Sequence, residues 1–193
     1  MPFSFSLHSE TMFKKFYPNE FVISKSQVKA SAGRGIRKAI IEQYPEFEKY
    51  ADELFPKKEN VVVAKCQNHI EIVIVNNKPL FYSVRDGPFF PVMRVLLRAP
   101  DMMKSVQVDK GAIKFVLGGA NIMCRGITSP GGRLPDGLEK GEPVAIFAEG
   151  KENPLAVGEM AMSSAEIKEK NEGIGIFLGN YLNDGLWQCL NLE

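Results

Sequence analysis

The chain has few of the residues on which enzymes and secreted domains depend. Its three cysteines, Cys66, Cys124 and Cys189, lie far apart and have no paired spacing. Disulfide frameworks and zinc sites need such pairs, so we predict neither, and we expect a reducing, intracellular compartment. The two histidines, His8 and His69, lack the neighbours of a metal site or a catalytic triad. No Walker-type or dinucleotide fingerprint is present. We therefore predict no catalysis, no cofactor and no metal.

Long hydrophobic runs and a strong net charge are also absent. No apolar run approaches the about 20 residues that span a bilayer, so no membrane segment is expected. The opening MPFSFSLHSET lacks the basic start and apolar core of a signal peptide, which favours a cytoplasmic protein. The net charge is +1, but residues 1–98 carry 15 basic and 10 acidic residues, against 9 and 13 in residues 99–193. This asymmetry indicates either a polyanion-facing half or ordinary variation between small domains.

The first half predicts helices packed on a small antiparallel sheet. Residues 33–44 and 45–55 carry apolar residues at helical spacing, and a proline follows each segment. Three β-rich runs then form a meander, with Asn76-Asn77 as one of its turns, and Phe21-Val22-Ile23 could add an edge strand. The meander strands are residues 61–66, 70–75 and 79–84. A connector containing Phe89-Phe90 ends near Ala99-Pro100.

The most informative segment lies in the second half, VDKGAIKFVLGGANIMCRGITSPG at residues 108–131. Asp109 can cap a short helix over residues 110–117, with Leu117 on its buried face, and Gly118-Gly119 can end it. A strand would follow at Ile122, and Arg125-Gly126 would begin a loop. Ser163 and Glu166 have the spacing of a capping box. Further strands are expected at residues 142–149, 155–162, 174–178 and 182–187. Many short strands separated by glycine and proline favour a small closed barrel.

Residues 108–131 resemble the signature of the PUA domain, a small RNA-binding β-pseudobarrel. Five further motifs occur in the order typical of the malignant T-cell amplified sequence family, and the resemblance covers residues 12–187. They are MFKKF at 12–16, PKK at 56–58, RDGPFFP at 85–91, EGIGI at 172–176 and YLNDGLW at 181–187. The implied fold class is α+β. An N-terminal pre-PUA-like domain of helices and antiparallel sheet (12–98) would precede a PUA β-pseudobarrel (99–193), and residues 1–11 would be a mobile extension.

The resemblance also implies a function. Members of this family are non-catalytic translation factors that pair with density-regulated protein and are similar to the N-terminal part of ligatin. The first domain would bind the small ribosomal subunit, and the PUA domain would bind RNA, with the tRNA acceptor region as its expected target. The complex would act in post-termination recycling and re-initiation. Two alternatives stay open: an RNA-binding module in ribosome biogenesis or RNA modification, and a protein-binding adaptor whose PUA domain no longer binds RNA.

The predicted RNA-binding residues of the PUA domain surround the glycine loop. Bare backbone amides there could bind phosphates, and nearby side chains could add charge or base-edge hydrogen bonds. Alternatively, the glycines only turn the corner of a barrel. Family members carry a proline where this chain has Arg125, so the direct role of Arg125 is our own prediction. The residues are Lys110, Gly118, Gly119, Ala120, Asn121, Arg125, Thr128, Ser129 and Arg133.

A second set of basic residues in the first domain could bind ribosomal RNA by neutralising phosphates. An ordinary solvated helix face is the alternative. Lys57-Lys58 carries less weight, because lysine after a helix end is favoured by the helix dipole. For Phe89-Phe90 and Trp187 we predict packing between the domains. The basic set consists of Lys14, Lys15, Lys25, Lys29, Arg34, Arg37 and Lys38.

Overall fold

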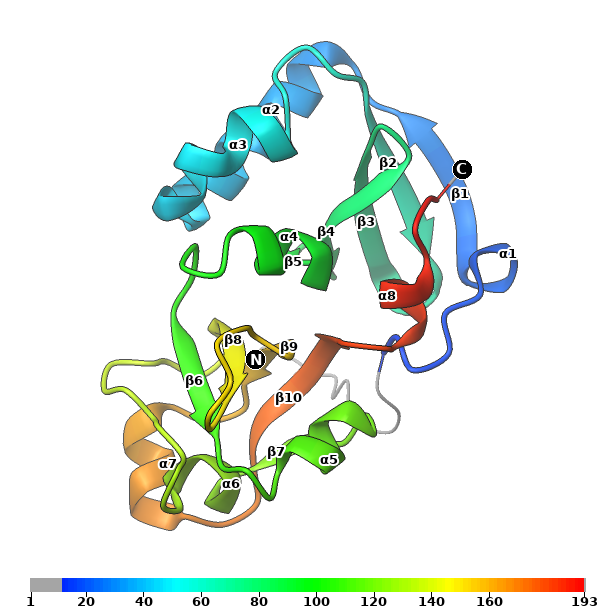
Figure 1. The fold of residues 1–193 in the computed structure, drawn as a ribbon. Coiled ribbons are helices and arrows are strands. Elements are labelled where there is room, and N and C mark those ends of the chain that lie inside the picture. The colour runs from blue at the N-terminus through cyan, green and yellow to red at the C-terminus, as the bar shows by residue number, and fades with distance from the viewer. Residues whose placement is uncertain (1–11, 193) are drawn as a thin grey trace, which may run out of the picture.

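The computed structural model describes residues 12–192, which form two five-stranded sheets lying one above the other in Figure 1. The expected mobile extension at residues 1–11 lies outside the described residues. Each sheet has its own buried core, and helix α4 (Met93–Arg98) lies between them. The α+β fold class is confirmed.

The first sheet is antiparallel throughout, and its strands follow the order of the chain. It is larger than the expected meander, because β1 and β5 extend it at its two edges. The turn at Asn76-Asn77 is confirmed, since both residues have the positive φ of a tight hairpin turn. The strands are β1 (Val22–Gln27), β2 (Val61–Cys66), β3 (Ile70–Val75), β4 (Lys78–Val84) and β5 (Phe90–Pro91).

Helices of the first domain bury their apolar residues against this sheet. Phe47 contacts Phe81 of β4 edge to face, with the ring centroids 5.2 Å apart. The single helix predicted over residues 45–55 is wrong in detail, because the segment begins as a 3-10 turn. Gly33 lets the first long helix approach β2 closely, since a Cβ there would lie 2.9 Å from Val61 Cγ2. The helices are α1 (Pro18–Phe21), α2 (Ala30–Gln43), η1 (Pro45–Phe47) and α3 (Glu48–Leu54).

The second sheet has the order β6-β8-β9-β10-β7, in which only the β6–β8 pair is parallel. The predicted capping box is confirmed, because Ser163 Oγ accepts from Glu166 N at 3.2 Å and Glu166 Oε2 accepts from Ser163 N at 2.9 Å. The strands are β6 (Ser105–Val108), β7 (Ile122–Met123), β8 (Pro143–Ala148), β9 (Ala156–Met160) and β10 (Ile174–Tyr181), and the helices are α5 (Ile113–Leu117), α6 (Arg125–Thr128) and α7 (Ser164–Lys170).

Three local predictions in this domain are wrong. The helix expected from Lys110 begins only at Ile113, because Asp109 Oδ1 accepts from Ala112 N at 3.0 Å and closes a preceding turn. The loop expected at Arg125-Gly126 is the first turn of α6. The last predicted strand, residues 182–187, is a turn followed by helix α8 (Gly185–Gln188).

Residues after β10 return to the first domain, and α8 lies beside its sheet in Figure 1. Gly185 N donates to Phe13 O at 2.8 Å, and Leu192 N donates to Asn77 O at 2.7 Å. The buried side chain of Asn180 connects the two domains, since its Oδ1 accepts from Met93 N at 2.6 Å.

The prediction that Trp187 packs between the domains is confirmed, and Phe90 packs on a tyrosine that contacts the second domain. Phe90 stacks on Tyr82, with the ring centroids 5.2 Å apart, and the Tyr82 hydroxyl accepts from Asn180 N at 3.3 Å. The Trp187 ring of α8 packs against the Arg94 guanidinium of α4 at 4.4 Å. Arg94 Nη2 also donates to Trp187 O at 2.7 Å. The connector and the C-terminal segment are therefore fixed to each other.

Candidate nucleic-acid interface

The glycine loop does not present bare amides. The N–H groups of Gly118, Gly119 and Ala120 all donate to carbonyl oxygens of α5, at 2.9–3.2 Å. Gly119 has a φ of +86°, which an L side chain rarely adopts, and it ends the helix. The expectation of phosphate contacts through these amides is therefore wrong. The glycines close α5 and direct the chain into β7.

Large apolar side chains are exposed on both sides of this loop. The side chain of Phe115 on α5 is 57% exposed, and that of Met123 on β7 is 51% exposed. Lys114 Nζ lies 4.9 Å from the centroid of the Phe115 ring. Leu117 is also exposed, which contradicts its predicted burial, and Val116 is the buried residue of the helix. An exposed phenylalanine beside a lysine is a platform on which an unpaired base can stack.

Sequence reasoning missed Phe115, although a signal for it exists. Val116 and Ala112 are four residues apart and mark the inward side of the segment. A residue next to Val116 then lies away from that side.

Three of the predicted polar contacts support the local fold instead. Asn121 Oδ1 accepts from Leu178 N at 2.9 Å and fixes the entry of the chain into β7. Thr128 Oγ1 lies 2.6 Å from Asn171 Oδ1 and donates toward the end of α7. The Ser129 hydroxyl donates to the carbonyl oxygen of Arg125. These side chains hold α6 and β7 in place.

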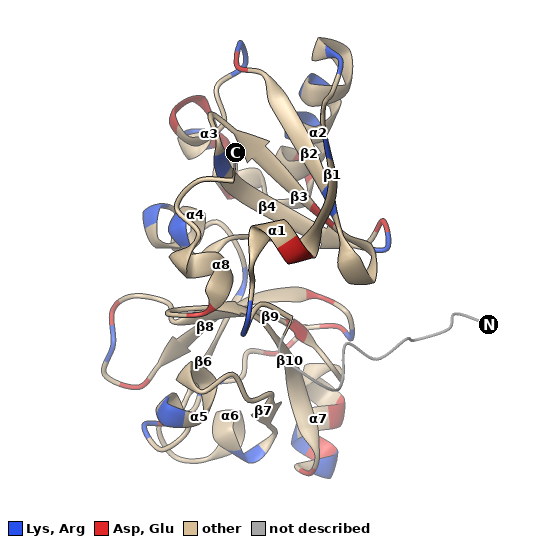
Figure 2. Ribbon diagram, turned by 90° about the vertical axis from the view of Figure 1, so that its right-hand side faces the viewer, with Lys and Arg blue, Asp and Glu red and all other residues tan. Residues whose placement is uncertain are grey.

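The predicted cations of the PUA-like half differ in their surroundings. Arg125 is exposed at the start of α6 and forms no ion pair within the described part of the chain. Lys110 is exposed before α5, and its backbone N–H donates to Glu149 Oε2 at 3.0 Å. Arg133 Nη2 donates to Ser105 Oγ at 3.2 Å on another strand. Figure 2 shows α5 and α6 side by side, and Lys114 is the basic residue of α5. The face formed by α5, α6 and the loop into β7 is hereafter the α5–α6 face.

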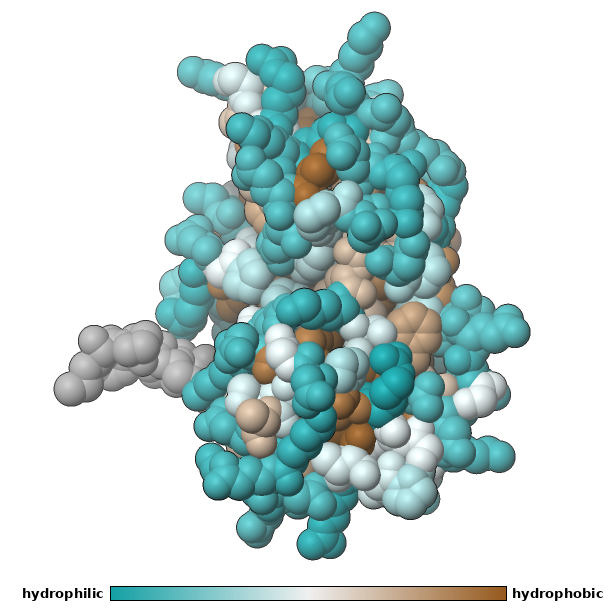
Figure 3. Space-filling model, turned by 90° about the vertical axis from the view of Figure 1, so that its left-hand side faces the viewer, coloured by the Kyte–Doolittle hydropathy of each residue, from teal (hydrophilic) through white to brown (hydrophobic). Residues whose placement is uncertain are grey.

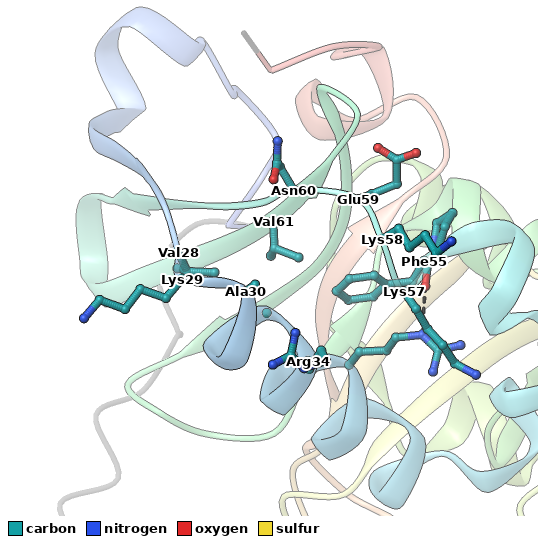
Figure 4. A pocket seen from close by; sticks show the side chains of 13 residues that line it. Val28, Lys29, Ala30, Arg34, Phe55, Lys57, Lys58, Glu59, Asn60 and Val61 are labelled. Atoms are coloured by element: carbon teal, nitrogen blue, oxygen red, sulfur yellow. Dashed lines mark hydrogen bonds between the residues drawn. The ribbon is translucent and has the colours of Figure 1, made fainter.

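The predicted basic set of the first domain does not form one surface. Lys29, Arg34 and Arg37 line a cavity of about 260 Å³ at the start of α2, together with Lys57 and Lys58 (Figure 4). The two lysines after the helix end therefore belong with the basic set, although their position in the sequence argues only for a helix-dipole role.

The other members of that set lie elsewhere. Lys38 pairs with Glu42 at 3.6 Å on the same helix, and Lys25 lies on the edge strand β1. Lys14 and Lys15 are exposed between two buried phenylalanines near the domain junction.

Neither a metal centre nor a membrane segment is found in the described residues. No group of three or more histidine, cysteine, aspartate or glutamate side chains there could hold a metal ion. None of the helices between residues 12 and 192 is long and apolar enough to cross a bilayer. On the face shown in Figure 3 the hydrophobic areas are small and separated by hydrophilic residues.

Comparison with known proteins agrees with this architecture. The Pre-PUA-like domain family matches residues 16–100, and the PUA domain family matches residues 104–181. The Malignant T-cell-amplified sequence 1 homolog of Dictyostelium discoideum is 46% identical over 182 residues, covering 94% of this chain and 100% of that protein. The Malignant T-cell-amplified sequence 1-A protein of Xenopus laevis is 49% identical over 177 residues, covering 91% and 97%. The chain belongs to the malignant T-cell-amplified sequence family.

A solved structure shares the two-domain arrangement of this family member. A hypothetical protein from the archaeon Pyrococcus horikoshii superimposes with a TM-score of 0.67 and 28% identity, over 86% of this chain and 98% of that one. A conserved PUA domain protein from Thermoplasma acidophilum, 20% identical, has the same fold with a TM-score of 0.61. Family membership and the PUA domain together support an RNA-binding role associated with translation.

Proposed function

We propose that this chain is a non-catalytic, cytoplasmic translation factor. In this proposal the first domain binds the small ribosomal subunit, and the PUA domain binds RNA at the tRNA acceptor region. The chain acts as a heterodimer with density-regulated protein in post-termination recycling and re-initiation. Family membership supports the cellular role. The exposed Phe115 ring beside Lys114 is the observation that carries the RNA-binding part.

Binding at the α5–α6 face would combine stacking and charge. The acceptor end of a tRNA is single-stranded, so its bases can leave their own stack and lie on an aromatic ring. Such stacking contributes about 1–3 kcal/mol per base by alanine substitution. Lys114 lies beside the ring, Lys110 and Arg125 are exposed before α5 and on α6, and these cations would neutralise phosphates of the bound RNA. The glycine loop would contact the RNA only through its surface shape, because its N–H groups donate hydrogen bonds to carbonyl oxygens of α5.

A truncated tRNA provides the test of this stacking model. We would measure binding of deacylated tRNA by fluorescence anisotropy, with and without its single-stranded 3′ end. Phe115→Ala should weaken binding of intact tRNA by about 5- to 150-fold, which corresponds to 1–3 kcal/mol, and should leave binding of truncated tRNA unchanged. Arg125→Ala should weaken both and reduce the salt slope by about 1.

Leu190→Ala is the matched control, because Leu190 is an exposed hydrophobic residue on the C-terminal segment next to the first domain. It should bind both RNAs as the unmodified protein does. If Phe115→Ala and Leu190→Ala behaved alike, while both kept the near-UV circular dichroism of the unmodified protein, stacking at Phe115 would be refuted.

A protein-binding role for the same face is the second candidate, because Leu117 of α5 and Met123 of β7 are also exposed hydrophobic residues. Exposed hydrophobic groups that lie together are typical of protein interfaces. In that case Phe115→Ala would weaken binding of density-regulated protein and leave tRNA binding unchanged.

A further inference from the structure

The cavity at the start of α2 has five basic residues among the thirteen that line it. It encloses about 260 Å³ between the first turns of α2 and the segment that joins α3 to β2 (Figure 4). Val28, Val61 and Phe55 form an apolar wall. The charged lining consists of five basic residues, Lys29, Arg34, Arg37, Lys57 and Lys58, and one acidic residue, Glu59.

Most of this positive charge is not compensated by the protein. Arg37 and Lys57 share one carboxylate, that of Asp52, at 2.8 and 3.8 Å. Among the described residues, no ion pair involves Lys29, Arg34 or Lys58. A concave site with an apolar wall concentrates the field of such charges and attracts an anion. The ligand that this lining fits is therefore anionic.

The interior of the cavity is held in a fixed geometry. The Arg37 side chain is only 12% exposed, and its Nε donates to Phe55 O at 2.8 Å. That bond ties α2 to the end of α3, so the two sides of the cavity keep their spacing. Close packing of Gly33 on Val61 fixes α2 against β2 as well. No side chain caps the start of α2, so the N–H groups of its first turn add the partial positive charge of the helix dipole to the charge of the basic side chains.

We propose that this cavity binds a phosphodiester group of an RNA backbone. This inference rests on the proposed RNA- and ribosome-binding function, and it names the part of the first domain that receives a phosphate. A nucleotide with its base would need more than this volume, since pockets for such ligands typically enclose about 300–1,000 Å³. Lys29, Arg34 and Lys58 are exposed at the rim, where they reach the phosphates on either side of the bound one.

Two triple variants with equal loss of charge test the proposal. The cavity triple is Lys29→Ala, Arg34→Ala and Lys58→Ala, and the control triple is Lys65→Ala, Lys140→Ala and Lys151→Ala, whose residues are exposed outside the cavity. Binding of each full-length protein to vacant small ribosomal subunits is measured across a salt series. The cavity triple should bind at least about 10-fold more weakly, with a salt slope reduced by about 1 for each phosphate that is no longer neutralised. Equal weakening in both triples would show diffuse attraction and overturn the proposal.

A second measurement separates this proposal from the ribosome-binding function on which it rests. Backbone amide NMR spectra are recorded with a short single-stranded RNA and, separately, with inorganic phosphate. The RNA should shift the Gly33 and Asn60 signals in the unmodified protein and not in the cavity triple. If these shifts occurred without binding to the subunit, ribosome binding would fail and the phosphate site would stand. Shifts with inorganic phosphate that RNA does not displace, or no shifts with RNA, would overturn the RNA site.

Discussion

Asp184 gives the stability of this protein a specific pH dependence. Its side chain is 1% exposed and lies at the domain junction. It accepts hydrogen bonds from the backbone N–H groups of Tyr181 and Trp187, at 2.9 and 2.8 Å, and from Asn180 Nδ2. These bonds favour the charged form, but burial outweighs them and raises the pKa of Asp184 from 3.8 to about 6.

The sign of the effect follows from this raised pKa. The folded protein holds the Asp184 proton more tightly than the unfolded chain does, so the group contributes stability below pH 3.8 that is lost as the pH rises through about 6. A shift from 3.8 to about 6 corresponds to about 3 kcal/mol at 1.36 kcal/mol per pKa unit. Asp184→Asn removes the titration, because an amide stays neutral. Its NH2 group also replaces one accepting oxygen by a donor, and this costs stability by the same amount at every pH.

Urea unfolding from pH 4 to pH 7 measures this prediction. The free energy of unfolding of Asp184→Asn, taken relative to that of the unmodified protein, should rise by about 2–3 kcal/mol between pH 4 and pH 7. Leu190→Ala is the control, since Leu190 is exposed and has no titratable group, and its curve should run parallel to that of the unmodified protein. A constant difference between the Asp184→Asn and unmodified curves would refute the reasoning.

Three further substitutions have defined outcomes. Gly179→Ala would place a methyl group against the buried hydroxyl of Tyr82, so the free energy of unfolding measured in urea should fall by about 1–3 kcal/mol. Gly35→Ala on α2 is the control: no atom lies within 4 Å of the added methyl group, and the free energy of unfolding should rise by about 0.5–1 kcal/mol. Equal effects of the two substitutions would contradict the packing argument. Ser163→Ala removes the capping box and should cost about 1 kcal/mol in the same assay; an unchanged midpoint would contradict the assigned role of the cap. Arg94→Ala uncovers the single tryptophan ring, so its fluorescence should shift to longer wavelength, and an unshifted spectrum would contradict the stacking.

Local sequence patterns are sufficient to predict the helices and strands that are determined by residues close together in the chain. Strands β2 and β3 are predicted with their observed bounds, because β-branched residues alternate there between short polar turns. The helix after Ser163 follows from its capping box. The prediction for residues 182–187 fails because a buried contact decides their structure. Asp184 accepts from the N–H groups on either side and turns a strand-like run into the start of α8.

The candidate sites depend on contacts that one sequence does not reveal. A double glycine indicates a helix end, but only the structure shows that its amides are used within α5. Lys58 lies 29 residues after Lys29, and α3 and its loop fold back to place both at the same cavity. Helical periodicity describes one element at a time, so it cannot predict that residues of different elements line the same cavity.

Sedimentation of the full-length chain with vacant small ribosomal subunits tests the central claim most directly. The chain is centrifuged alone and with density-regulated protein, across a series of salt concentrations. The account predicts co-sedimentation that weakens steeply as salt rises, because phosphate neutralisation drives it, and that strengthens when the partner is present. No association under either condition, with a partner that is itself shown to bind its targets, would contradict the account.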